Sequence, residues 1–254
     1  NNLRILKQFN GCCFADLDLK QQGVIEDFQL LFYIIQPPTP ERVKYDIFDR
    51  VNRGGTPLNK QEMRNALYRG RCTRMLDKLC CSPEFLIATG RSINKERMKD
   101  QYVVLRAMAF LMLHRGEFKD IPALQYRGDI DDFLARFMVY VNDNAPEKLI
   151  VDYENLFIRC MQISYDLLGE NGFRFSGNGI RRPINMPLFE ALSYLFSFVP
   201  EKIDYTWASR LILDIESVKE EFDDSRYFSG NIDSTTSVSF RFDRMDKIIN
   251  RIQL

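Results

Sequence analysis

The sequence lacks the residues from which many catalytic and metal sites are built. It has one histidine, His114, and none of its six cysteines forms a C-x-x-C pair. One histidine is too few for an H-E-x-x-H zinc site or for a histidine-rich nuclease centre. Neighbouring cysteines rarely form disulfides, because the bond between them is strained. We therefore expect reduced, mostly buried thiols, and a zinc site formed by Cys12, Cys13, Cys80 and Cys81 is the alternative.

Long apolar runs and an excess of one charge are also missing. No apolar run reaches the roughly 18 residues of a membrane-spanning helix, and Phe28 to Ile35, which contains Gln29, is only strand-sized. The sequence has no recognisable secretory signal. Its 35 basic and 35 acidic residues give a formal net charge of zero, which argues against a polybasic nucleic-acid tail. These absences predict a cytoplasmic protein with no membrane partner.

Glycine and proline are scarce, at 13 and 10 of 254 residues, which favours helices over a many-stranded sandwich or barrel. Apolar residues recur at helical spacing over most of the chain, as in Met98, Tyr102, Leu105 and Ala109. The pattern predicts helices over residues 39–51, 58–70, 94–114, 129–141, 147–168, 187–198, 206–222 and 237–254. The predicted fold class is therefore mainly α.

One or a few short β-strands are expected near the N-terminus. Residues Val24 to Ile35 are rich in β-branched and aromatic side chains, and prolines follow directly. A lone strand is not stable, and the chain opens on asparagine rather than methionine, so we expect partner strands upstream of residue 1. The chain then forms a single domain or the C-terminal portion of one, with a strand-containing edge at 1–38 and a helical part at 39–254.

A double-glycine turn between two predicted helices is the best candidate for binding. The segment Asn52-Arg53-Gly54-Gly55 interrupts the helical pattern, and a capping-box spacing at Asn59 and Glu62 starts the next helix. Glycines let backbone N–H groups converge, and a helix N-terminus adds partial positive charge. Arg53 and Lys60 add full charges, so the turn suits a phosphate group. The alternative is that the turn only connects two helices.

Charges of opposite sign gather in two stretches. From Glu41 to Arg74 there are nine basic and four acidic residues, a net charge of +5. From Glu201 to Asp224 there are eight acidic and three basic residues, a net charge of −5. The basic stretch contains the turn and suits phosphate, and both stretches are candidate docking surfaces for a protein partner. Arg181 and Arg182, in a glycine-containing loop, are expected to be solvated.

The residues around the turn also form a long, specific pattern. It runs approximately F-x-R-x-N-x-G-G-T-x-L-x-x-Q-E-x-R-N-A, and the matching positions are Phe48, Arg50, Asn52, Gly54, Gly55, Thr56, Leu58, Gln61, Glu62, Arg64, Asn65 and Ala66. This pattern resembles the core motif of the domain family at the N-terminus of GmrSD-type restriction enzymes, which cut modified DNA. Weaker similarity extends over nearly the whole chain, at Phe14–Leu17, Met98–Phe110, Phe133-Leu134 and Ser234–Arg244.

That family is similar in turn to the ParB and sulfiredoxin superfamily, whose members handle nucleotide phosphates. The resemblance implies phosphate contacts by Asn52, Arg53, Gly54 and Gly55, with Arg64 as a secondary candidate. Arg50 and Glu62 are instead candidates for an ion pair that orients the turn. The implied cofactor is a nucleoside triphosphate with magnesium in the full-length protein.

Two parts of the family pattern are missing from this sequence. The D-G-Q-Q-R motif and the F-Q-R segment before it do not occur, and in the family they lie upstream of the position equivalent to Asn1. Many members continue into an HNH-type nuclease domain, which needs several histidines. We therefore expect this chain to be the downstream, mainly helical part of such a protein, and we assign it no catalytic residues.

Three functions follow from these observations. The first is a part in a nucleotide-dependent protein of DNA restriction or phage defence, in which the turn helps to bind nucleotide and the chemistry depends on residues elsewhere. The second is a helical interaction module that docks a nuclease domain, a partner subunit or a second copy of the chain. The third, direct DNA binding, is disfavoured by the zero net charge and by the lack of a recognition-helix signature, so DNA contacts would come through other domains.

Overall fold

The computed structural model of the chain describes residues 5–32, 34, 36, 43, 46–48, 50, 57–176, 181–200, 202, 204–228 and 230–252. The chain divides into two compact units, Asn1–Asp46 and Ile47–Leu254. The first unit begins with three short elements, the 3-10 turns η1 (Lys7–Phe9) and η2 (Phe14–Asp16) and the helix α1 (Leu19–Glu26). None of these three elements contains a buried residue.

The strand predicted for Val24–Ile35 is absent from the described part of this segment. Its first three residues belong to α1 instead, because Asp18 starts that helix with a capping box. The described residues that follow have no regular secondary structure, and the side chains of Phe28, Leu31 and Phe32 are 69–78% exposed. No strand among the described residues lies beside them, and an unpaired strand is not stable.

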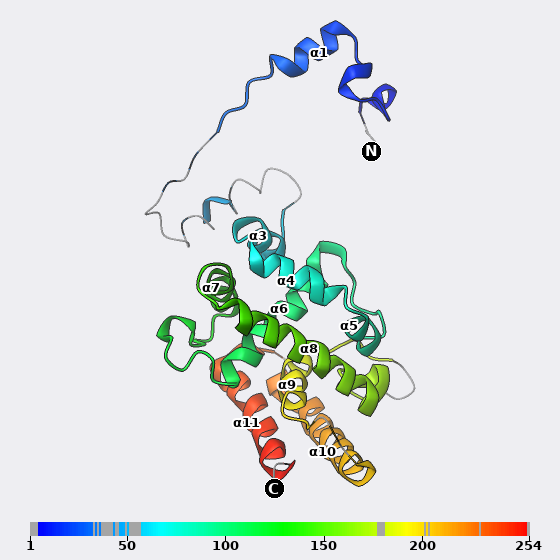
Figure 1. Ribbon diagram of the computed structural model, residues 1–254, viewed down its shortest axis with the longest axis vertical. Coiled ribbons are helices and arrows are strands. Elements are labelled where there is room, and N and C mark those ends of the chain that lie inside the picture. The colour runs from blue at the N-terminus through cyan, green and yellow to red at the C-terminus, as the bar shows by residue number, and fades with distance from the viewer. Residues whose placement is uncertain are drawn as a thin grey trace. The chain divides into compact units, whose positions relative to one another are not determined.

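The second unit consists of helices and short turns in its described residues (Figure 1). Its α-helices are α3 (Lys60–Leu67), α4 (Arg71–Cys80), α5 (Pro83–Ala88), α6 (Lys99–His114), α7 (Ile130–Asp143), α8 (Glu147–Leu168), α9 (Met186–Phe196), α10 (Tyr205–Asp223) and α11 (Thr235–Ile252). Its 3-10 turns are η3 (Glu96–Met98), η4 (Pro122–Leu124), η5 (Gly169–Asn171) and η6 (Arg226–Phe228). The fold class is mainly α, as the sequence predicted.

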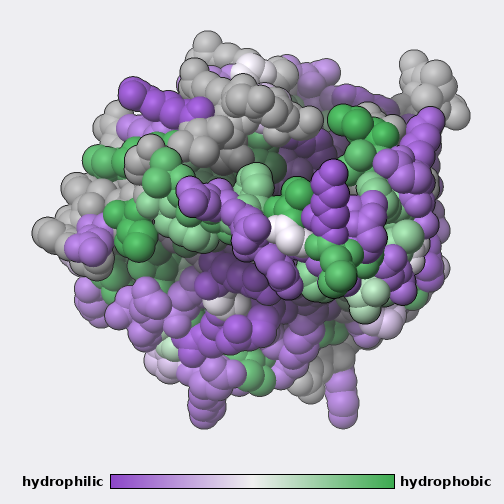
Figure 2. All heavy atoms as spheres, turned by 90° about the horizontal axis from the view of Figure 1, so that it is seen from above, coloured by the Kyte–Doolittle hydropathy of each residue, from purple (hydrophilic) through white to green (hydrophobic). Residues whose placement is uncertain are grey.

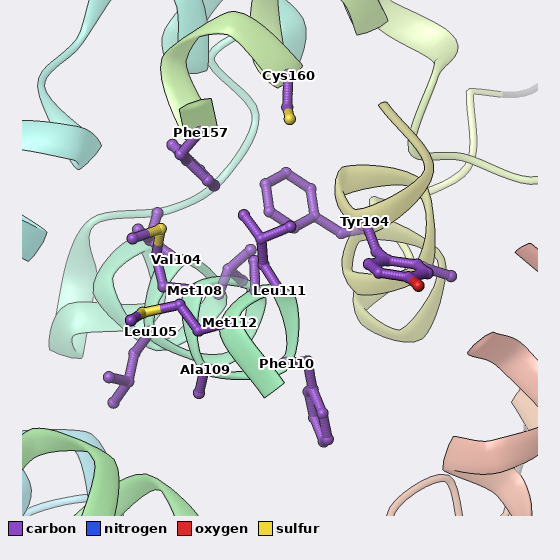
Figure 3. Packing of buried hydrophobic residues seen from close by; sticks show 14 of the residues in the cluster. Val104, Leu105, Met108, Ala109, Phe110, Leu111, Met112, Phe157, Cys160 and Tyr194 are labelled. Atoms are coloured by element: carbon purple, nitrogen blue, oxygen red, sulfur yellow. The ribbon is translucent and has the colours of Figure 1, made fainter. Parts of the chain in front are cut away.

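Helix α6 forms the centre of the second unit. It packs against α3, α4, α7, α8 and α9, and every residue from Val103 to Met112 is at most 3% exposed. A helix buried on all sides must be surrounded by other elements, unlike a surface helix with one apolar stripe. Figure 3 shows Phe157 and Cys160 of α8 and Tyr194 of α9 gathered around the side chains of α6. The core therefore fixes the helices that carry the charged residues Arg64, Arg106 and Glu190.

The surface is mixed in character. On the face shown in Figure 2, hydrophobic side chains are interspersed among hydrophilic ones. Within the described ranges, no helix combines the length and the apolar character that crossing a bilayer requires.

Candidate phosphate-binding site

The start of α3, shortly after the double-glycine turn, is fixed by a reciprocal cap. The side-chain oxygen of Asn59 accepts hydrogen bonds from the N–H groups of Gln61 and Glu62, at 2.8 and 2.9 Å. The Glu62 carboxylate accepts one from the Asn59 N–H, at 2.7 Å. The predicted capping box is therefore confirmed. Because the N–H groups of Asn59, Gln61 and Glu62 are already bonded, they are not available to bind an anion.

The loop between α5 and α6 supports this helix start. The Arg97 guanidinium donates hydrogen bonds to the Glu62 carboxylate, at 3.0 Å, and to the Pro57 carbonyl, at 2.6 Å. The Asn59 side-chain amide donates one to the Arg97 carbonyl, at 2.7 Å. The hydrogen bond from Arg97 lowers the pKa of Glu62 below its usual value, which keeps the carboxylate ionised at neutral pH. Glu62 thus pairs with Arg97 rather than with Arg50, the partner considered from the sequence.

Arg64 is only 1% exposed and ties α3 to α7. Its guanidinium donates hydrogen bonds to the Asp131 carboxylate, at 2.8 Å, and to the Gln61 side chain, at 3.1 Å, and lies 5.2 Å from the centre of the Tyr102 ring. Burial raises the pKa of Asp131, but hydrogen bonds from Lys60 and Arg64 outweigh it, so the net shift is downward. The Nη2 atom of Arg64 is buried without a hydrogen-bond partner among the described residues, which leaves one donor unused.

The other predicted phosphate contacts, Asn52, Arg53, Gly54 and Gly55, lie outside the described residues. The described chain resumes at Pro57, whose carbonyl is bound by Arg97. Lys60, on the first turn of α3, is 68% exposed and pairs with Asp131. Of the predicted set, the structure therefore places Arg64 alone, on a helix whose start is firmly held.

A second charged cluster lies between α6, α9 and α11. Arg106 and Arg241, 1% and 0% exposed, both donate to the carboxylate of Glu190, which is itself 0% exposed. Arg106 also donates to the Asp233 carboxylate at 2.6 Å, and the Tyr126 hydroxyl donates to the Asp233 carbonyl. Two guanidinium groups and two carboxylates balance each other, as buried charges require. The cluster therefore holds three helices together and has no net charge to offer a ligand.

The one histidine belongs to the core. The His114 ring stacks on Phe242, with ring centroids 3.6 Å apart and an interplanar angle of 10°. Burial, together with the positive charge of Arg241, lowers the pKa of His114 to about 3. The imidazole is therefore neutral at physiological pH and takes a structural position.

The cysteines and acidic residues form no metal centre in the described part of the chain. No three His, Cys, Asp or Glu side chains there are grouped to hold a metal ion. All six cysteines are free: Cys72, Cys80 and Cys160 are buried, and Cys12, Cys13 and Cys81 are exposed. Burial raises the pKa values of the three buried thiols, so they remain protonated.

Half of the carboxylates in the acidic stretch are paired within the fold. Four of its carboxylates form ion pairs: Asp214 with Arg251, Glu216 with Lys219, Glu221 with Arg244 and Asp223 with Arg182. Arg181, next to Arg182, pairs with Glu170 at 2.7 Å. The two loop arginines are therefore partly exposed members of ion pairs rather than solvated singly, and much of the local excess of negative charge is neutralised.

The sequence did not reveal the partners of the motif residues Glu62 and Arg64. Arg97 is 35 residues from Glu62, and Asp131 is 67 residues from Arg64. Asp131 carries one local signal, its place in the acidic first turn of α7, and that signal indicates a helix start rather than a partner for Arg64. Such pairs depend on how helices pack, so spacing along the chain does not reveal them.

No protein-family model, curated protein or solved structure matches this chain. The resemblance to GmrSD-type proteins therefore rests on the sequence motif alone. A helical fold serves many unrelated functions, so the fold itself does not choose among them.

Proposed function

We propose that this chain is the downstream, helical part of a GmrSD-type, ParB-like nucleotide-handling protein that acts in DNA restriction or phage defence. In it, the Asn52–Gly55 turn binds a phosphate group of the nucleotide. The observation that carries the proposal is the length of the sequence match, because twelve positions between Phe48 and Ala66 agree with the family motif. A match of that length is much more specific than an isolated glycine pair.

The contacts of α3 support the proposal. Motif residue Glu62 bonds both to the Asn59 N–H and to Arg97, so the start of α3, shortly after the turn in the sequence, is held in place. A binding loop that is followed by a fixed segment loses less conformational entropy when it binds a ligand. Arg53 supplies a full positive charge, and Arg64 remains the secondary candidate, because its buried Nη2 has no hydrogen-bond partner among the described residues.

The assigned residues suit the phosphate rather than a magnesium ion. Backbone amides and guanidinium groups bind phosphate oxygens, whereas magnesium is bound through carboxylate, phosphate and water oxygens. In this proposal the nucleotide brings its magnesium ion, and the residues of this chain orient the phosphate.

Isothermal titration with ATP and GTP, each with magnesium, tests this proposal. It uses the present chain and a chain extended upstream to include a D-G-Q-Q-R segment. We expect the extended chain to bind, and Arg53→Ala to weaken binding by about 1.5–3 kcal/mol because a charge-assisted contact is lost. The matched control is Arg74→Ala, which removes an exposed arginine of the same basic stretch. Equal affinities for the two variants reject the role of Arg53.

The second candidate is a helical interaction module that docks a nuclease domain or a partner subunit. The apolar segment after α1 favours it, since Phe28, Leu30, Leu31, Phe32 and Ile34 are 67–79% exposed. Neighbouring exposed apolar side chains of this kind often mark a surface that binds another protein.

Co-purification of a tagged chain with its nuclease subunit tests this alternative. The Phe28→Ser, Leu31→Ser double variant should lose the subunit and keep its nucleotide affinity. The control replaces two exposed polar residues of α1, Lys20→Ser with Glu26→Ser, and should keep both. Retention of the subunit by the Phe28 and Leu31 variant rules out docking through this segment.

A further inference from the structure

A cavity lies beside the loop that joins α5 to α6. It is half open to solvent and has a volume of about 400 Å³, within the range of roughly 300–1,000 Å³ that small-molecule pockets span. Phe85 and Leu86 of α5 and Ile93 of the loop line it with apolar groups. The cavity therefore has room for a small ligand with an apolar body, and its lining residues are distinct from the phosphate contacts assigned above.

Charged side chains line the same cavity. Arg91 and Lys95 are exposed, and neither forms a hydrogen bond or an ion pair through its side chain within the described structure. Asp100, at the start of α6, also lines the cavity and is 7% exposed. Two cations against one carboxylate leave a net positive charge, which favours an anionic ligand. The unpaired cations distinguish this lining from the neutral cluster around Glu190.

The backbone around the cavity is held in an uncommon conformation. Arg91, Arg97 and Met98 have φ angles of 51°, 56° and 58°, and no other non-glycine residue in the described part of the chain has a positive φ. L-residues adopt this region only when the surrounding structure compensates, and such residues cluster at functional sites. Arg174 provides part of that support, since its buried guanidinium donates to the Thr89 carbonyl at 3.2 Å. The loop is therefore shaped before a ligand arrives.

We propose that this cavity binds a small phosphate monoester that carries an aromatic or apolar body. Arg91 and Lys95 bind the phosphate oxygens with charge-assisted hydrogen bonds. The body lies against Leu86 and Ile93, and Asp100 accepts a hydrogen bond from a hydroxyl or amino group where the ligand has one. The site shares no residue with the nucleotide turn.

Phenyl phosphate is the probe for this proposal, because it joins a phosphate to an aromatic ring. An NMR titration follows the isoleucine methyl signals of the full chain, and Ile93→Val identifies the signal of Ile93. We expect that signal to shift saturably with phenyl phosphate. Inorganic phosphate and phenol, the two halves of the probe, should each bind at least about tenfold more weakly, because each makes only part of the contacts.

Double variants test whether the positive charges of Arg91 and Lys95 bind the phosphate. Arg91→Ala with Lys95→Ala should weaken phenyl phosphate binding at least about tenfold. The control, Arg74→Ala with Lys148→Ala, removes the same two charges at exposed positions outside the cavity and should bind as the unmodified chain does. Arg53→Ala should also bind normally, so failure here leaves the nucleotide proposal standing.

Three results would overturn the cavity proposal. They are an Ile93 signal that does not move, an inorganic phosphate affinity equal to that of phenyl phosphate, and an unchanged affinity in the Arg91 and Lys95 variant. If that variant does not fold, the Ile93 titration of the unmodified chain still decides between binding and no binding.

Discussion

The basic side chains of the second unit are paired in one region and unpaired in another. Between α6, α9 and α11, Arg106 and Arg241 are buried and share the carboxylate of Glu190. Along the α5–α6 loop, Arg91 and Lys95 are exposed and form no ion pair in the described structure. The first pair uses its charge inside the fold, and the second leaves its charge available to a ligand. The partner of a basic side chain, rather than its type or its place in the sequence, therefore indicates its role.

The largest expected effect comes from Glu190→Gln. This change leaves two buried guanidinium groups with one carboxylate too few, and the free energy of unfolding should fall by about 3–5 kcal/mol. Urea denaturation followed by circular dichroism measures it. The control is Glu147→Gln at an exposed ion pair with Arg71, where a change of at most about 1 kcal/mol is expected. Equal effects at the two sites would remove the contrast between buried and exposed cations.

The pH dependence of stability tests how closely the core encloses His114. Its pKa is about 3 in the folded chain and about 6.5 when unfolded, so between these values only the unfolded chain binds the proton. Stability should therefore fall as the pH drops below 6.5, by up to about 1.4 kcal/mol per pH unit, or about 2 kcal/mol by pH 5. His114→Phe keeps the stacking on Phe242 and should lose this slope. If the free energy of unfolding changes equally with pH in both proteins between pH 7 and pH 5, His114 is not buried as described.

Asn59→Ala should have a smaller effect, a loss of about 0.5–2 kcal/mol, because the cap of α3 is removed. Hydrogen exchange should quicken at the amides of Gln61 and Glu62, which the cap binds. Asn144→Ala, at an exposed asparagine after α7, is the matched control and should change neither quantity. Unchanged exchange in the Asn59 variant would mean that the cap does not hold the helix start.

The smallest effect on stability is expected from Arg91→Ala with Lys95→Ala. Exposed side chains without partners contribute little to folding, so the free energy of unfolding should change by less than about 0.5 kcal/mol. Thermal unfolding measured beside the Glu190→Gln variant provides the comparison. A loss above about 1 kcal/mol would assign the two cations a structural role and would weaken the case for a ligand in the cavity.

Most of the helical fold follows from the spacing of apolar residues. The predicted helix 147–168 has the bounds of α8, and the predicted helix 237–254 corresponds to α11, which Ser234 caps through a hydrogen bond accepted from the Ser237 N–H at 3.1 Å. The predicted helix 94–114 is interrupted by the positive φ angles of Arg97 and Met98, and the regular part, α6, starts at Lys99. Local patterns indicate a helix, but tertiary contacts decide where it bends.

Other elements escaped prediction for identifiable reasons. In α4, Cys72, Met75, Leu76 and Leu79 recur at helical spacing and are buried, but the helix is short and its last residue, Cys80, was a candidate zinc ligand. In α1, the capping box at Asp18 outweighed a run of strand-forming side chains. Of the candidate site, the sequence predicted only those contacts that join residues a few positions apart. The cap of α3 is local, whereas the bonds made by Arg97 and Asp131 depend on packing between distant segments.

The central claim is that the backbone amides of the double-glycine turn bind a phosphate group, and an NMR titration tests it most directly. The chain extended to include the D-G-Q-Q-R segment is labelled with nitrogen-15 and titrated with magnesium ATP. The account predicts that the amide signals of Gly54 and Gly55 shift saturably, with a higher dissociation constant for Arg53→Ala. Binding of ATP that shifts other amides and leaves those of Gly54 and Gly55 unmoved would contradict it.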